Sequence, residues 1–119
     1  MQGNRIIVPF HIPGTLAANL TILFQAVKDM TLVTVQSVNT ANSSATFTLG
    51  TSATADVYLT TQDVGDSSTP AVVQSKASFV GGQFPHIAAG TIIALAVDFD
   101  GASGTAAANL TLVLEFLEG

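Results

Sequence analysis

Apolar and polar residues alternate along most of this chain, and a repeat of two residues is the pattern of a β-strand with one buried face. The alternation is clearest in 109–117, where Leu110, Leu112, Leu114 and Phe116 fall on one face. It recurs in five other segments, 5–12, 18–26, 45–49, 71–80 and 93–99. Two more segments, 30–40 and 56–61, are rich in Val and Thr but leave the register open. The sequence therefore predicts about eight strands.

Clusters of Gly, Pro, Asn, Asp and Ser separate these segments, as expected for turns between short strands. No window has the spacing of a long amphipathic helix. We therefore predict an all-β chain: a single-domain antiparallel β-sandwich over residues 1–119, jelly-roll-like, with a short N-terminal arm. Pro9 places the first strand at a sheet edge, because proline has no backbone N–H to donate to a neighbouring strand.

Large aromatic side chains are expected to hold the two sheets together. They fall on seven predicted strands, one to a strand: Phe10, Phe24, Phe47, Tyr58, Phe79, Phe99 and Phe116.

Ionised side chains are scarce on this chain. Charged residues make up 9% of it, three basic and eight acidic, whereas about 25% is usual for a soluble domain. The positions opposite the predicted core carry small neutral residues, together with Ile7, Leu23, Val72 and Val113. A solvated sheet usually carries charge that prevents association. We therefore predict a closed homo-oligomer, a trimer, or docking on a protein lattice; a neutral monomeric surface is the alternative.

The same composition argues against several classes of partner. The basic residues Arg5, Lys28 and Lys76 are scattered, so no cluster can bind nucleic acid. The net charge of −5 disfavours anionic membranes, and no apolar run is long enough for a transmembrane helix. The absence of cysteine excludes disulfides and thiolate sites. Without signal-peptide features, we expect Met1 to be the natural start of a complete chain made in a cytoplasm.

Catalysis has little support in the sequence. His11 and His86 are the two histidines, and the serines fall in polar turn clusters rather than beside a base. We therefore expect no enzyme, no cofactor and no small-molecule substrate. Asp98 and Asp100 are the best metal candidates, but they flank a core Phe and precede Gly101, so a hairpin turn is the favoured interpretation and bound Ca²⁺ the alternative.

Two stretches of sequence carry a family resemblance. The chain opens with Ile-Val-Pro-Phe-His-Ile-Pro-Gly-Thr over 7–15, and the later run 81–91 reads Gly-Gly-Gln-Phe-Pro-His-Ile-Ala-Ala-Gly-Thr, followed by Val-Asp-Phe-Asp-Gly over 97–101. In these features the chain resembles the small β-sandwich virion proteins of tailed bacteriophages. The resemblance implies a capsid decoration or cement protein, bound as a trimer to the major capsid protein lattice on the outer surface of the virion. It transfers no active-site residues.

Our main hypothesis is accordingly a bacteriophage virion structural protein that stabilises the shell. The candidate assembly or binding-loop residues are Phe10, His11, Gln83, Phe84 and His86. The alternative is a receptor- or glycan-binding module of a phage tail fibre or host adhesin, which would use 83–86 or 62–68.

Overall fold

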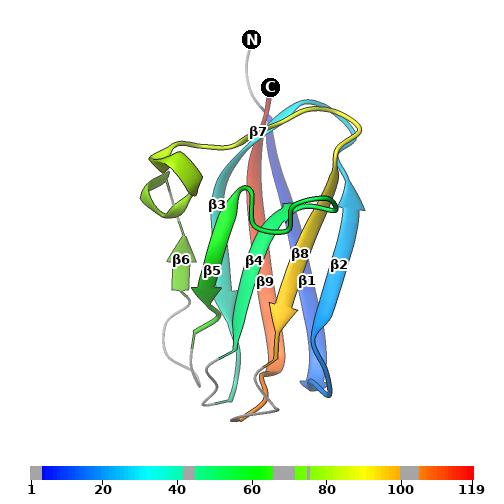
Figure 1. Cartoon of the computed structure of the whole chain (residues 1–119), viewed down its shortest axis with the longest axis vertical. Helices are drawn as coiled ribbons and strands as arrows, with labels where there is room; N and C mark the ends of the chain where they lie inside the picture. Colours follow the sequence, from blue (N-terminus) through cyan, green and yellow to red (C-terminus); the bar gives the residue numbers. More distant parts are fainter. Residues whose placement is uncertain (1–3, 42–44, 66–71, 75, 100–104) are drawn as a thin grey trace.

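Two antiparallel β-sheets face each other in the computed structural model of the chain (Figure 1). The structure describes residues 4–41, 45–65, 72–74, 76–99 and 105–119. The first sheet has the strand order β1-β9-β3-β6, with the short β7 paired to the first two residues of β3, and the second has the order β2-β8-β4-β5. The strands of the first sheet are β1 (Arg5–Thr15), β3 (Met30–Val38), β6 (Val72–Gln74), β7 (His86–Ile87) and β9 (Ala108–Glu118). Those of the second are β2 (Leu20–Gln25), β4 (Thr46–Thr51), β5 (Leu59–Asp63) and β8 (Ile92–Asp98).

The connectivity confirms the predicted jelly-roll-like sandwich. The chain crosses between the sheets from β1 to β2, from β2 to β3, from β3 to β4, from β5 to β6, from β7 to β8 and from β8 to β9. Each sheet thus interleaves early and late strands, as two Greek keys do. Within the described part of the chain, no helix has the length and apolar character needed to span a membrane.

The core lies between the sheets, where the alternating residues meet. On β9 every second residue from Leu110 to Phe116 is fully buried, and on β8 the same holds for Ile93, Leu95 and Val97. Aromatic rings link the sheets: the Phe24 ring of β2 lies 5.4 Å from that of Phe10 on β1 and 6.5 Å from that of Phe116 on β9. The edge position predicted from Pro9 is also confirmed, because β1 ends the order of its sheet.

The predicted strand over 71–80 is wrong beyond its first residues. The strand β6 ends at Gln74, and two short 3-10 turns follow, η1 (Lys76–Ser78) and η2 (Val80–Gly82). Gly81 and Gly82 have φ values of 77° and 65°, which residues with a side chain rarely adopt, so the backbone turns here. Phe79 is buried between the two turns rather than on a strand.

The expectation of one aromatic residue per strand fails for the same kind of reason. Phe79 lies between turns, Tyr58 precedes β5 and Phe99 follows β8. All three still pack in or against the core. A side chain that points inward can be buried even when its backbone is not hydrogen-bonded within a sheet. The aromatic contribution to the core is therefore confirmed, and its placement on strands is not.

The connection between β4 and β5 folds back over the outer face of the second sheet. Its backbone closes a turn, with Thr51 N donating to Thr54 O at 2.8 Å, and it is tied to β8 by a bond from Ser52 N to Ile92 O. Gly50 lies beneath this loop, and a Cβ atom there would collide with the carbonyl oxygen of Thr54 and the backbone of Ala55. The close approach of the loop therefore requires glycine at position 50.

Replacing Gly50 by Ala is expected to lower the free energy of unfolding by about 1–3 kcal/mol, because the added methyl group meets backbone atoms that cannot rotate away. Urea unfolding followed by circular dichroism measures the change. Ser52→Ala, at an exposed position of the same loop, is the control and should be close to neutral. Equal stability of Gly50→Ala and the wild type would contradict the described loop position.

Candidate assembly and binding surfaces

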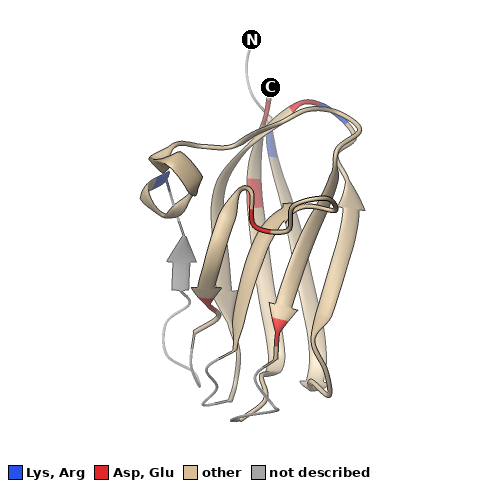
Figure 2. Ribbon diagram, viewed as in Figure 1, with Lys and Arg blue, Asp and Glu red and all other residues tan. Residues whose placement is uncertain are grey.

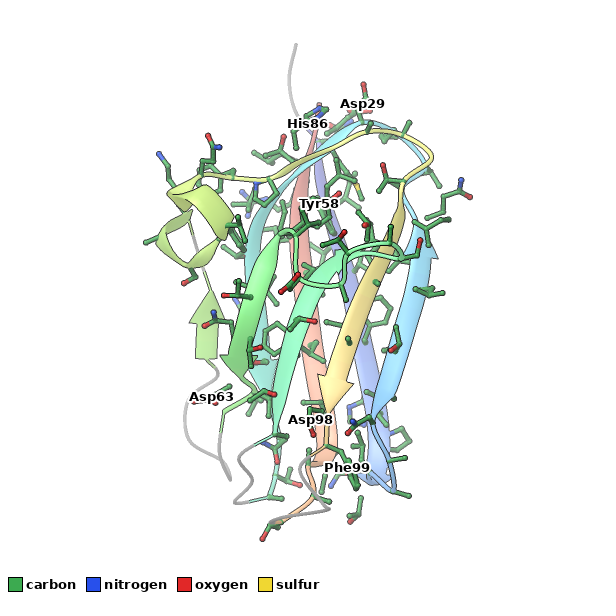
Figure 3. All side chains as sticks on the ribbon, viewed as in Figure 1. Asp29, Tyr58, Asp63, His86, Asp98 and Phe99 are labelled. Atoms are coloured by element: carbon green, nitrogen blue, oxygen red, sulfur yellow. The ribbon has the colours of Figure 1, made fainter. Side chains whose placement is uncertain are left out.

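The five candidate residues from the sequence do not come together. Phe10 and His11 lie on β1, opposite Leu112 and Thr111 of β9. His86 lies on β7, opposite Thr31, and belongs to the same lateral row as Arg5 at the start of β1. His11 is six residues further along β1, roughly 20 Å away along the strand. Figure 3 shows His86 at one end of the sandwich, with Asp98 and Phe99 at the other.

Phe10 and His11 point to opposite sides of β1. Phe10 faces the core, is partly buried and packs against Phe24. His11 faces outward, and its Nδ1 lies 2.8 Å from the Thr111 hydroxyl on the neighbouring strand. Of these two residues, His11 is therefore the one that offers a polar group on the outer face of the first sheet.

The other three candidates lie in the loop before β7 and at the first residue of β7. Gln83 and His86 are exposed, and the Phe84 ring is 42% exposed. That ring lies 6.4 Å from the Phe79 ring, with Lys76 Nζ 5.7 Å above its centroid, within the range of a cation–π contact. The backbone is anchored by Leu32 N, which donates to Pro85 O at 2.9 Å. This anchored loop therefore exposes an aromatic side chain that is in contact with Phe79 and Lys76.

The structure describes one of the two metal candidates. Asp98 ends β8 and is exposed, and Asp100 lies outside the described residues. Asn19 Oδ1 accepts a hydrogen bond from the backbone N–H of Phe99, the residue after Asp98, at 3.1 Å. Among the described residues, no group of three or more His, Asp or Glu side chains could hold a metal ion.

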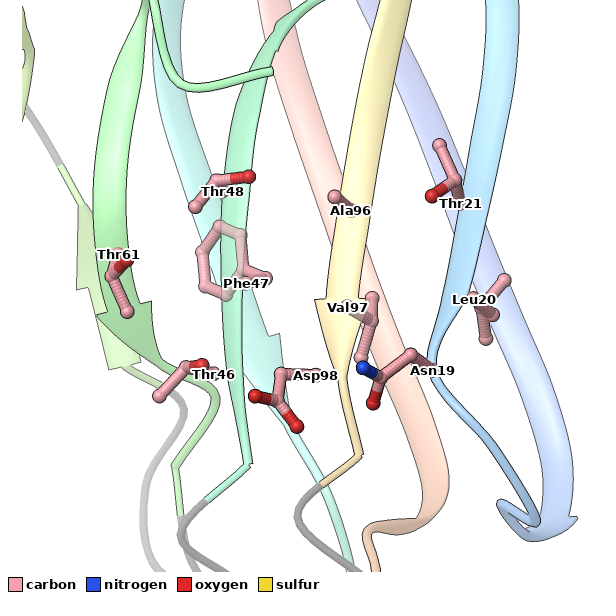
Figure 4. Close-up of a pocket in the computed structure, with 10 residues that line it drawn as sticks. All are labelled: Asn19, Leu20, Thr21, Thr46, Phe47, Thr48, Thr61, Ala96, Val97 and Asp98. Carbon is pink, nitrogen blue, oxygen red and sulfur yellow. The ribbon is translucent and has the colours of Figure 1, made fainter.

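A shallow groove crosses the outer face of the second sheet (Figure 4). It has a volume of about 400 Å³. Ala96 pairs laterally with Thr21 on β2 and with Thr48 on β4, so a methyl group lies between two larger side chains and the surface is hollowed. Thr46, Thr61, Asn19 and Asp98 complete its polar lining. The groove offers hydroxyl, amide and carboxylate groups for hydrogen bonding.

Sequence reasoning missed the groove because it depends on the register between strands. The available signal is Ala96, a small residue among the outward positions of β8. Small residues on the outer face of a central strand indicate a depression only once their neighbours are known.

The side of the sandwich formed by β1 and β2 is open. Their core-facing side chains are only partly buried, whereas those of β8 and β9 are fully buried. We call this row the β1–β2 seam; its members are Ile6, Val8, Phe10, Ile12, Leu20, Ile22 and Phe24. The sequence predicts all seven as core, and the structure shows that the core reaches the surface here.

Charge is distributed unevenly along the molecule (Figure 2). The three basic residues lie toward the end that carries the termini, where Arg5 pairs with Glu115, and Lys28 Nζ lies 2.8 Å from Glu118 Oε2. The hydrogen bond from Lys28 and its positive charge lower the pKa of the Glu118 carboxyl. Asn4 Nδ2 also donates to Glu118 Oε1 at 3.1 Å. The last strand is thus fastened to both the start of the chain and the turn after β2.

This ion pair predicts a pH dependence of stability. Because the pKa of Glu118 is lowered in the folded state, the stabilisation is present above the ordinary value of 4.5 and is lost as the pH falls through the lower folded value. Wild type should therefore melt slightly higher than Glu118→Gln at neutral pH, with the difference vanishing in acid, and the effect should be small because the pair is exposed. Thermal melts of both proteins across this range measure it. A melting difference that is constant with pH would contradict the assignment.

Comparison with known proteins gives a likeness at the level of fold. No protein-family model matches the chain, and no curated protein matches its sequence. Among solved structures, the chain is similar to one titled "Cyanophage Pam1 capsid asymmetric unit", with a TM-score of 0.60 and 17% sequence identity. The match covers 99% of this chain and 87% of the other. The expected resemblance to bacteriophage virion proteins is therefore confirmed for the fold, which extends over nearly the whole of both chains.

Proposed function

We propose that this chain is a structural protein of a bacteriophage virion, and more specifically a capsid decoration or cement protein that binds the outer surface of the head as a homotrimer. The single observation that carries the proposal is the fold shared with a chain of the cyanophage Pam1 capsid asymmetric unit over 99% of this sequence. The expectation of a virion protein came independently from the sequence, so two different kinds of comparison support it.

The mechanism is adhesion without chemistry. The outer faces of both sheets present mainly neutral side chains, with Thr48 and Ala96 on one and Thr111 and Val113 on the other. Such residues allow close approach because little charge has to be desolvated. An interface of roughly 1,600 Å² in total is ordinary for a specific complex. Many copies bound in this way would oppose the outward pressure of packaged DNA.

The charge of the molecule suits an outward position on the head. The net charge is −5, and two of the three basic residues, Arg5 and Lys28, are engaged by Glu115 and Glu118. Lys76 lies over the Phe84 ring. A surface of this kind does not bind DNA or the nucleic acid of the host, because phosphate contacts need clustered free cations. We propose no catalytic role, cofactor or small-molecule substrate.

A receptor- or glycan-binding module is the second candidate, and the exposed Phe84 ring is the observation that favours it. Sugars stack on aromatic faces, and Gln83 and His86 could supply hydrogen bonds beside the ring. The ring already has Lys76 over it, which reduces the free face. Binding of the purified protein to a glycan array, abolished by Phe84→Ala, would favour this candidate over the first.

The capsid proposal predicts saturable binding to phage heads that lack this protein. Purified chain mixed with such heads should co-sediment at a fixed number of copies per head and raise the melting temperature of the shell. The measurement is quantitative gel densitometry of sedimented heads with parallel calorimetry. The control is an unrelated acidic β-sandwich of similar size. Absence of binding, or binding that grows without a plateau, would contradict the proposal.

A further inference from the structure

The sandwich is closed on one side by its own chain and left open on the other. At the β5–β6 side, the segment with η1 and η2 covers the core: Phe79 is 2% exposed, and Val80 N donates to Tyr58 O at 3.0 Å. At the opposite side, no described segment performs this task, and the β1–β2 seam keeps its apolar side chains partly in contact with solvent. Figure 1 shows the two sides, with the η segment beside β6 and the edges of β1 and β2 across the molecule.

We propose that the β1–β2 seam is the surface on which a second copy of this chain packs. Exposed apolar residues extend the seam onto both outer faces, with Ile7 of β1 59% exposed and Leu23 of β2 57% exposed. Phe10 and Phe24 meet across the seam with their rings 5.4 Å apart. Single apolar side chains at a surface need no explanation, but a continuous row of this kind marks an interaction site.

The available area is sufficient for a stable contact between two copies. The molecule measures 45 × 28 × 26 Å, and the side that carries the seam is spanned by its longest and shortest axes. That side offers on the order of 1,000 Å², against about 800 Å² per partner in a standard interface. A contact on this side can therefore reach the usual size without using either outer sheet face fully, which leaves those faces for the lattice.

Charge favours another copy of this chain as the occupant. All eight acidic residues lie at position 29 or later, and from position 1 to 28 the ionised side chains are Arg5 and Lys28 alone. Both cations lie toward one end, paired with Glu115 and Glu118. Two copies with a net charge of −5 each repel, and the repulsion is least when they meet through segments that contain no carboxylate. Strands β1 and β2 are such segments.

The backbone of β1 argues against an added peptide strand. Pro9 and Pro13 lie in this edge strand, and proline has no N–H to donate to a neighbouring strand. A peptide that extends the first sheet would therefore meet an interrupted ladder. Side-chain packing against a folded partner does not need those donors, so the seam suits a second folded copy better than an extended segment.

This inference rests on the proposed function only where it assumes that copies associate. The location of the contact surface follows from the difference in burial between the covered β5–β6 side and the open β1–β2 side. In a trimer, the seams of three copies would meet around the threefold axis. In a dimer, two seams would face each other.

Charged substitutions at the two exposed positions that flank the seam test the inference. Ile7→Glu and Leu23→Glu place a carboxylate in the contact, and both positions are exposed, so the fold of one copy should tolerate them. Val80→Glu is the matched control, because Val80 is 46% exposed and lies in η2, which covers the opposite side. Thermal unfolding of each variant establishes that it is folded.

Sedimentation equilibrium at micromolar concentration gives the mass of each protein. We expect the wild type and Val80→Glu to have the same multiple of 12.1 kDa, and each seam variant to associate at least tenfold more weakly. Folded seam variants that keep the wild-type mass, or a wild type of 12.1 kDa, would overturn the inference. The head-binding assay is scored separately: a monomer that saturates heads would overturn the seam and the homotrimer but leave the capsid role, whereas an oligomer that does not bind heads would overturn only the capsid role.

Discussion

The packing of the two sheets against each other is the interaction on which the rest of the structure depends. The central strands β9 and β3 of one sheet and β8 and β4 of the other supply most of the fully buried side chains, among them Leu112, Phe116, Leu95 and Phe47. Each such side chain contributes roughly 1.5–3 kcal/mol when it leaves water. With so few charges on the chain, this burial is the main source of stability, and the positions of the edges, loops and outer faces follow from it.

The two edges of the sandwich differ in how far their core side chains are covered, and this difference connects the fold to assembly. The chain covers the β5–β6 side with its own 3-10 turns and Phe79. The described residues leave the β1–β2 side uncovered, where Ile22 and Phe24 are only partly buried. A small domain that leaves part of its core at the surface gains stability by burying that surface against a neighbour. The neutral outer faces then remain available for a larger assembly, as the proposed function requires.

The alternation in the sequence predicts the sheets but cannot predict which strands are central. Residues 5–12 and 109–117 show the same pattern, yet Phe10 is half-buried on an edge and Phe116 is fully buried at the centre. Pro9 is the one local signal that separates them. The groove beside Ala96 depends on cross-strand register, which no single segment encodes. The alternation over 71–80 wrongly predicts a strand through residues 76–80. Phe79 is buried there as a strand residue would be, but the backbone forms turns, with positive φ at Gly81 and Gly82.

The central claim is that neighbouring copies, rather than water, cover the open side of the sandwich. Amide hydrogen exchange of the wild-type protein, followed by mass spectrometry at high and low protein concentration, tests this most directly. Outward-facing amides of edge strands have no ladder partner and exchange quickly in an isolated sandwich. The account predicts that peptides covering β1 (Arg5–Thr15) and β2 (Leu20–Gln25) exchange more slowly at high concentration, while those covering β5 (Leu59–Asp63) do not change. Exchange in β1 and β2 that is the same at every concentration would contradict it.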